Sequence, residues 1–216
     1  MTEKIDLSNV DKHLKGFLEY RKSALGQVAN DREISIAKDM EFLSNKSAFK
    51  NIENDELEYL IYKYFSVPRG MGQMGYLKSD YYVRDLLKAT SITVFKSELF
   101  MLLHGKKELS IRWDKFMSKV RMIDTYNTSM LLGFTFPDKY CIWSLKLFYA
   151  LDKLKPFSSD RIDKLRNHYS KVSGKDYLLI LSFMNSLRNY LQKSNLKIRN
   201  YLDVNTYIHF LSPKGG

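Results

Sequence analysis

Residues 109–136, with the sequence LSIRWDKFMSKVRMIDTYNTSMLLGFTF, contain the pattern that decides the fold class. Apolar residues spaced by threes and fours mark the first half of this stretch: Leu109, Trp113, Phe116, Met117 and Val120. This spacing predicts an amphipathic helix that continues to Met122. Residues 123–126 predict a short turn, and the nearly all-apolar run 129–136 predicts a second helix that ends before Pro137. We therefore expect two helices joined by a tight turn.

The same helical spacing recurs on both sides of this stretch. Asp31 is a candidate cap for the second helix of the chain, and the pair Asp31 and Glu33 is expected at its start, where acidic groups complement the helix dipole. No repeat of fixed length is present. The further predicted helices cover residues 10–28, 31–42, 54–65, 81–88, 92–103, 143–154, 158–171, 174–193 and 204–211.

The composition supports an all-α fold of roughly ten helices in one or two helical subdomains. Ten glycines and four prolines in 216 residues are too few for a sandwich or barrel, which needs a turn about every 8 to 12 residues. A hydrophobic content of 44% is enough for a packed core and excludes a wholly disordered chain.

Cysteine usage and hydropathy indicate a cytoplasmic protein. The single cysteine, Cys141, excludes an internal disulfide framework and a cysteine-rich zinc site. No stretch approaches the roughly 18 apolar residues of a membrane span. Residues 1–8 have neither the apolar run nor the small-residue cleavage site of a signal peptide. We therefore expect a reducing, intracellular environment.

The strongest loop signal is the segment 68–75, with the sequence PRGMGQMG. It predicts a glycine-rich loop over residues 68–78 between an N-terminal helical portion, 1–67, and a C-terminal one, 79–211. Residues 212–216 resemble a linker. The glycines do not form a phosphate-binding P-loop, because Gly75 is followed by Tyr76 and Leu77 rather than by Lys and Ser or Thr.

Signals for catalysis or for a cofactor are missing from the sequence. The four histidines are scattered, without a second metal ligand at helical spacing. The carboxylates form no tight cluster, and no serine or cysteine lies in a recognisable nucleophile elbow. We therefore expect no metal, no cofactor and no catalytic residue.

Positive charge is the main functional signal. The chain carries 35 Lys and Arg against 24 Asp and Glu, a formal net charge of +11. Much of this charge lies between residues 69 and 121, where tyrosines accompany it. Such a pattern is typical of a surface that binds the phosphates of a nucleic acid, whereas the alternative for any single helix is an ordinary solvated face. The candidate phosphate contacts are Arg69, Lys78, Arg84, Lys106, Lys107, Arg112, Lys115 and Lys119.

The stretch Lys106–Leu154 resembles a helical region near the N-terminus of McrB-like subunits of modification-dependent restriction systems. The resemblance rests on residues 136–143, FPDKYCIW, which are followed by a leucine-rich helix, and on residues 102–105, LLHG, which precede the helical pair. The segment is more distantly similar to the helix-hairpin-helix region of DNA base-excision glycosylases. Its turn, however, has no glycine, and Ser144 follows Trp143 where those glycosylases place an aspartate.

The resemblance implies a recognition role without catalysis. In such systems the N-terminal region recognises DNA, often with a modified cytosine, while a separate NTPase motor and a nuclease subunit act on it. The region would then bind duplex DNA in a restriction or antiviral defence protein. Tyr126 and Tyr140 are the candidate base contacts, and Trp143 is expected in the core because its spacing matches a buried face.

Two other functions remain open at this point. A degenerate glycosylase or lyase would need a carboxylate near an exposed lysine, and Asp138 and Asp152 are the nearest candidates. A helical protein-interaction module is the other alternative.

Overall fold

The helical character of the chain is confirmed by a computed structural model, which describes residues 5–65 and 72–212, the side chains of residues 72–80 excepted. The described residues form twelve α-helices and one 3-10 helix and contain no strand. No helix among them combines the length and the apolar character needed to cross a membrane. The helices are α1 (Asp11–Lys22), α2 (Ala24–Met40), η1 (Glu41–Ser44), α3 (Lys46–Asn51), α4 (Asn54–Phe65), α5 (Gly72–Ala89), α6 (Ile92–His104), α7 (Leu109–Lys119), α8 (Thr125–Thr135), α9 (Leu145–Leu154), α10 (Ser159–Asn167), α11 (Gly174–Lys193) and α12 (Tyr201–Leu211).

The boundary predicted near Asp31 is wrong. Helix α1 ends before Ser23, which has an extended backbone. The Ser23 hydroxyl accepts a hydrogen bond from Gly26 N at 3.2 Å. The observed cap, Ser23, lies eight residues before the predicted cap, Asp31. Asp31 and Glu33 therefore lie inside α2. Val28, the last residue of the predicted first helix, lies on α2 and is 66% exposed.

Other boundaries also differ from the prediction: α3 was not predicted, α10 ends at Asn167 rather than at residue 171, and α12 begins at Tyr201 rather than at residue 204. Residues 72–78, predicted as loop from their glycine content, belong to α5, whereas residues 66–71 lie outside the described part. A glycine costs a helix only about 1 kcal/mol relative to alanine, so two of them do not prevent it. The turn after α7 covers residues 120–124 rather than 123–126, because Asp124 accepts from Asn127 N at 2.8 Å and caps α8 there.

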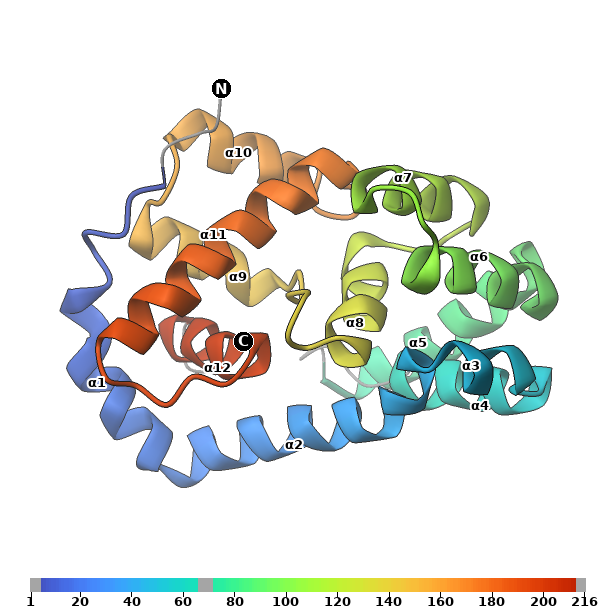
Figure 1. The fold of residues 1–216 in the computed structure, drawn as a ribbon, viewed down its shortest axis with the longest axis horizontal. Coiled ribbons are helices and arrows are strands. Elements are labelled where there is room, and N and C mark those ends of the chain that lie inside the picture. The colour runs from blue at the N-terminus through green and yellow to red at the C-terminus, as the bar shows by residue number, and fades with distance from the viewer. Residues whose placement is uncertain (1–4, 66–71, 213–216) are drawn as a thin grey trace.

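Helix α8 lies at the centre of the fold (Figure 1). Ten of its eleven residues are buried, including polar residues, so the helix has no solvent-facing side. Helix α2 runs beneath it and also packs against α12 (Figure 1). Helices on both sides of the glycine-rich segment therefore share one hydrophobic core.

Helices α7 and α11 pack at unusually close range. The rings of Trp113 and Tyr177 stack with centroids 4.2 Å apart, and Trp113 Nε1 donates to Val172 O at 2.9 Å. At the start of α11, Gly174 lies so close to α7 that a Cβ atom on it would be 2.3 Å from Ser110 O. Only glycine fits this contact, because the atoms that it faces belong to the backbone.

We predict that Gly174→Ala lowers the free energy of unfolding by about 1–3 kcal/mol, since the added methyl group must push α11 away from α7. Gly16→Ala is the control, because its Cβ would meet only the ring of Phe210, at 3.0 Å. Urea denaturation of both variants measures the difference. Equal stabilities would contradict the close packing described for Gly174.

Candidate nucleic-acid interface

The predicted phosphate contacts lie in three different settings. Lys106 and Lys107 are exposed in the connection between α6 and α7, and Arg84 and Lys119 are exposed on α5 and at the end of α7. Arg84 lies over the ring of its own helix neighbour Tyr81, with 4.5 Å between Cζ and the ring centroid. Two members fall elsewhere: Arg69 lies outside the described residues, and Lys78 belongs to α5 without a described side chain.

Arg112 and Lys115 are engaged within the protein. The Arg112 guanidinium donates to the carbonyl oxygens of Leu102 and Lys107, the second at 2.9 Å from Nε. It therefore binds the last turn of α6 and fixes the connection that carries Lys107. Lys115 Nζ lies 3.3 Å from a carboxylate oxygen of Glu98 on α6.

The exposed members are divided between the two ends of α7. The C-terminal end of α7, with Lys119, lies next to the end of α5. Arg121 N there donates to Thr90 Oγ1 at 2.8 Å. Lys106 and Lys107 precede the N-terminal end. An eleven-residue helix spans roughly 15 Å at 1.5 Å per residue, so about this distance along α7 separates Lys107 from Lys119.

A cluster of aromatic rings lies where α6 ends, next to Lys106. His104 is its centre: the ring centroids of Phe100 and Phe136 are 5.2 and 5.9 Å from that of His104. Tyr140 extends the cluster beyond Phe136, at 6.0 Å. All four of these residues are half-buried, so the cluster lies at the boundary between core and surface. We call these four residues the His104 cluster.

Exposed lysines lie near the His104 cluster. Lys50 Nζ lies 5.7 Å from the Phe100 ring centroid, and Lys139 Nζ lies 5.3 Å from that of Phe136. The positive charge of Lys46 is close enough to act on His104. Lys106 and Lys107 follow His104 in the chain, so the cluster and its neighbouring segments carry five exposed lysines.

The surroundings of His104 lower its pKa. Burial lowers its pKa, and the charges of Lys46 and Arg112 lower it further, against a raising effect of its hydrogen bond to Leu43. The ring Nε2 is 2.8 Å from the Leu43 carbonyl oxygen and donates to it. His104 thereby joins α6 to η1.

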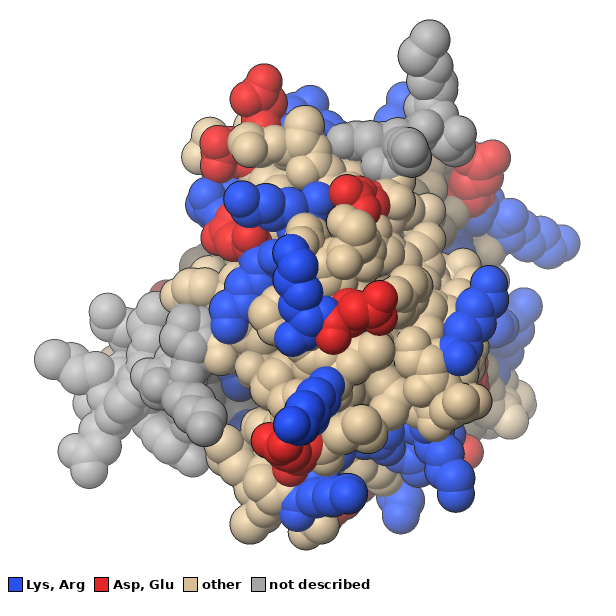
Figure 2. Space-filling model, turned by 90° about the vertical axis from the view of Figure 1, so that its left-hand side faces the viewer, with Lys and Arg blue, Asp and Glu red and all other residues tan. Residues whose placement is uncertain are grey.

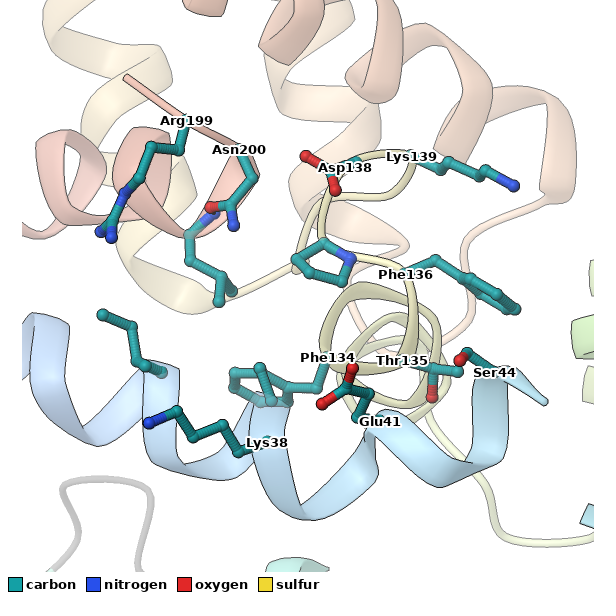
Figure 3. Close-up of a pocket in the computed structure, with 14 residues that line it drawn as sticks. Lys38, Glu41, Ser44, Phe134, Thr135, Phe136, Asp138, Lys139, Arg199 and Asn200 are labelled. Atoms are coloured by element: carbon teal, nitrogen blue, oxygen red, sulfur yellow. The ribbon is translucent and has the colours of Figure 1, made fainter. Parts of the chain in front are cut away.

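An open pocket of about 470 Å³ adjoins the cluster (Figure 3). Phe136 and Lys139 line one end of it, and Lys38 and Arg199 lie at the opposite end. The hydroxyl of Thr135 is buried in this wall and has no hydrogen-bond partner among the described residues. The lining therefore mixes cations with the carboxylates of Glu41 and Asp138, and Arg199 is itself paired with Asp203.

The two predicted base contacts differ in their position. Tyr140 belongs to the His104 cluster, whereas Tyr126 lies in the first turn of α8, partly buried. Trp143 is completely buried, as expected, and packs edge-on against Phe148 with centroids 5.3 Å apart.

Among the described residues, neither carboxylate considered for a glycosylase forms an ion pair with a lysine; both lie near arginines. Asp152 binds Arg166, with oxygens 2.5 and 2.7 Å from Nη2. Asp138 lines the pocket with a side chain that is 74% exposed, 3.8 Å from Arg188. Within residues 5–65 and 81–212, no group of three His, Cys, Asp or Glu side chains is placed to hold a metal ion.

Three of the five lysines around the cluster were missed by the sequence analysis. Lys46 and Lys50 are spaced four apart on α3, a signal that places both on one face of a helix, but nothing local relates them to residue 104. The face that includes α1 shows the contrast, since its basic side chains are interleaved with acidic ones (Figure 2).

Comparison of the chain with protein-family models, with curated proteins and with solved structures gives no match.

We predict that Arg112→Lys lowers the free energy of unfolding by about 1.5–3 kcal/mol, because a lysine keeps the charge but cannot reach both carbonyl groups in the same geometry. Arg84→Lys, on an exposed part of α5, should change it by less than about 0.5 kcal/mol. Denaturant titration of the two variants measures this difference, and a similar loss in both would show that the Arg112 contacts contribute little.

Proposed function

We propose that the chain is a DNA-binding recognition module whose interface is the His104 cluster with its five lysines. The observation that carries the proposal is the arrangement of these lysines around half-buried rings. Lysines contact phosphates and release the counterions that surround DNA, whereas ring edges contact sugars and bases. A solvated face would not require this pairing of charge with accessible aromatic rings.

The connection between α6 and α7 supplies the central contacts of the proposed interface. Lys106 and Lys107 are exposed there, and neither forms an ion pair with another described residue. Arg112 holds the backbone of this connection. Because that backbone is held in place, the two ammonium groups lose less freedom when they bind phosphates than they would on a mobile loop.

The wider setting of the proposal comes from the resemblance of residues 106–154. It supports a recognition part of a modification-dependent restriction or defence system, which reads duplex DNA with a modified cytosine. The NTPase motor and the nuclease would be other domains or subunits, and the recognition part would act in the cytoplasm without catalysis of its own.

We predict that Lys106→Ala/Lys107→Ala weakens binding of duplex DNA for every sequence tested and reduces the slope of log affinity against log salt by about 2. The wild-type slope should be roughly −5 for contact with six phosphates. Lys15→Ala/Lys22→Ala removes the same charge from exposed positions of α1 and is the control.

Fluorescence anisotropy at several salt concentrations measures both quantities. If the two double variants lose the same affinity, the interface lies elsewhere and only net charge matters. If wild-type protein does not bind DNA at low salt, the DNA-binding function is wrong.

We predict a preference for duplexes with 5-methylcytosine over unmodified duplexes of the same sequence, measured in the same titration. Equal affinities would contradict the restriction setting without affecting DNA binding itself. Release of uracil or alkylated bases by the purified protein would instead support the glycosylase alternative.

A further inference from the structure

A buried polar cluster joins α2 to α12. Glu33 on α2, 8% exposed, accepts a hydrogen bond through Oε1 from Asn205 Nδ2 on α12. One turn further along α12, His209 Nε2 lies 3.3 Å from Asn205 Nδ2 and 3.5 Å from Glu33 Oε1. A carboxyl group and an amide group thus meet in the core, between α2 and α12.

Two atoms of this cluster are left without a partner. Glu33 Oε2 and Asn205 Oδ1 are buried, and neither has a hydrogen-bond partner in the described part of the chain. Both are acceptors when the carboxyl group is ionised, so neither can satisfy the other. A buried acceptor without a donor is costly, and a carboxylate more so than an amide.

One proton removes this mismatch. A carboxyl group and an amide group are both planar, so when Oε1 accepts from Nδ2, a proton on Oε2 can be donated to Oδ1. The second N–H of Asn205 is then accepted by Nε2 of a neutral His209. Every polar atom of Glu33 and Asn205 has a partner in this arrangement.

We propose that Glu33 is protonated in the folded protein, so that its Oε2–H donates to Asn205 Oδ1 and the two side chains form a neutral acid–amide pair that clasps α2 to α12.

The charges around the cluster are consistent with two neutral groups. Burial raises the pKa of Glu33 to about 8, against the hydrogen bond from Asn205 and the charges of Lys146 and Arg32, and Asp203 raises it further. Burial lowers the pKa of His209 to about 3, and Lys146 and Arg32 add to this effect. Tyr20 on α1 also faces Glu33. Burial raises the pKa of Tyr20, and the charge of Glu33 would raise it further.

The clasp makes stability depend on pH in two opposite ways. Glu33 ordinarily titrates near 4.5, so above that pH folding must add a proton to it, and stability falls with rising pH until about 8. His209 ordinarily titrates near 6.5, so below that pH folding must remove its proton, and stability falls with falling pH until about 3. Between 4.5 and 6.5 the two effects cancel, because folding moves a proton from His209 to Glu33.

The clasp also supports one wall of the pocket. Ile34 and Ala37, which follow Glu33 on α2, line the pocket together with Leu202 on α12. Loss of the proton places a buried charge between the two helices that form this wall.

Glu33→Gln tests the proposal, because an amide at this position mimics the protonated acid: its oxygen accepts from Asn205 and its N–H₂ donates to Oδ1. We predict that this variant matches wild type near pH 4.5 and becomes more stable as pH rises. From pH 5 to pH 8 the ratio of the two folding constants should change by about 400-fold, approaching a factor of ten for each pH unit in the middle of this range. Asp31→Asn removes the same charge from an exposed position of α2 and should show no such change.

Denaturant midpoints of wild type and of both variants, measured from pH 4 to pH 9, give these ratios. A Glu33→Gln variant that is destabilised most at pH 5–6 would overturn the proposal in favour of an ion pair between Glu33 and His209. A ratio that does not vary with pH would also overturn it.

Infrared spectroscopy of wild type provides a readout that does not depend on the variant folding. The carbonyl band of a protonated, buried carboxyl group should persist through neutral pH and disappear near pH 8. Its absence at pH 6 would overturn the proposal. His209→Gln should remove the loss of stability on the acid side alone, because glutamine can accept from Asn205 but takes up no proton.

Discussion

Two buried hydroxyl groups on α8 fix the two non-helical segments that pack against it, one before α9 and one before α11. The rest of the structure depends on these two contacts. Ser129 accepts from the backbone N–H of Trp143 at 2.8 Å, and Thr125 accepts from that of Val172 at 2.9 Å. Both amides lie outside helices, where a buried N–H needs a partner from elsewhere. The segment after α8 is held at Cys141 as well, by the hydroxyl of Tyr177 at 2.7 Å. The rings of Phe136 and Tyr140 and the side chain of Lys139 are therefore carried on a segment that is anchored to the core on both sides.

Helices with local start signals were predictable from the sequence. Helix α11 occupies the predicted residues, since Ser173 caps it through Asp176 N and an apolar face follows. The boundary between α1 and α2 was not predictable from apolar spacing, because one hydroxyl, that of Ser23, outweighs a periodicity that continues past it. In α8 the periodicity itself is missing, because a helix that is buried all round needs no polar side.

The candidate site was only partly predictable, for a different reason. Lys106, Lys107 and Tyr140 could be chosen from local charge and aromatic content. Lys46 and Lys50 join them only through the contacts between α3 and α6, which no local pattern reports. Glu33 shows the same limit, since its spacing indicates an ordinary helix-start acid, whereas its properties depend on Asn205, 172 positions later in the chain.

The pairing of α1 with α12 has a consequence for synthesis on the ribosome. Phe17 packs edge-on against Tyr207 with ring centroids 4.9 Å apart, and the Tyr207 hydroxyl reaches the Val10 carbonyl across 197 positions of sequence. Contacts between such distant residues are slow to form, and here one partner emerges long after the other. The part of the apolar face of α1 that packs against α12 therefore stays uncovered until α12 has left the ribosome, although α2 can already pack against α1.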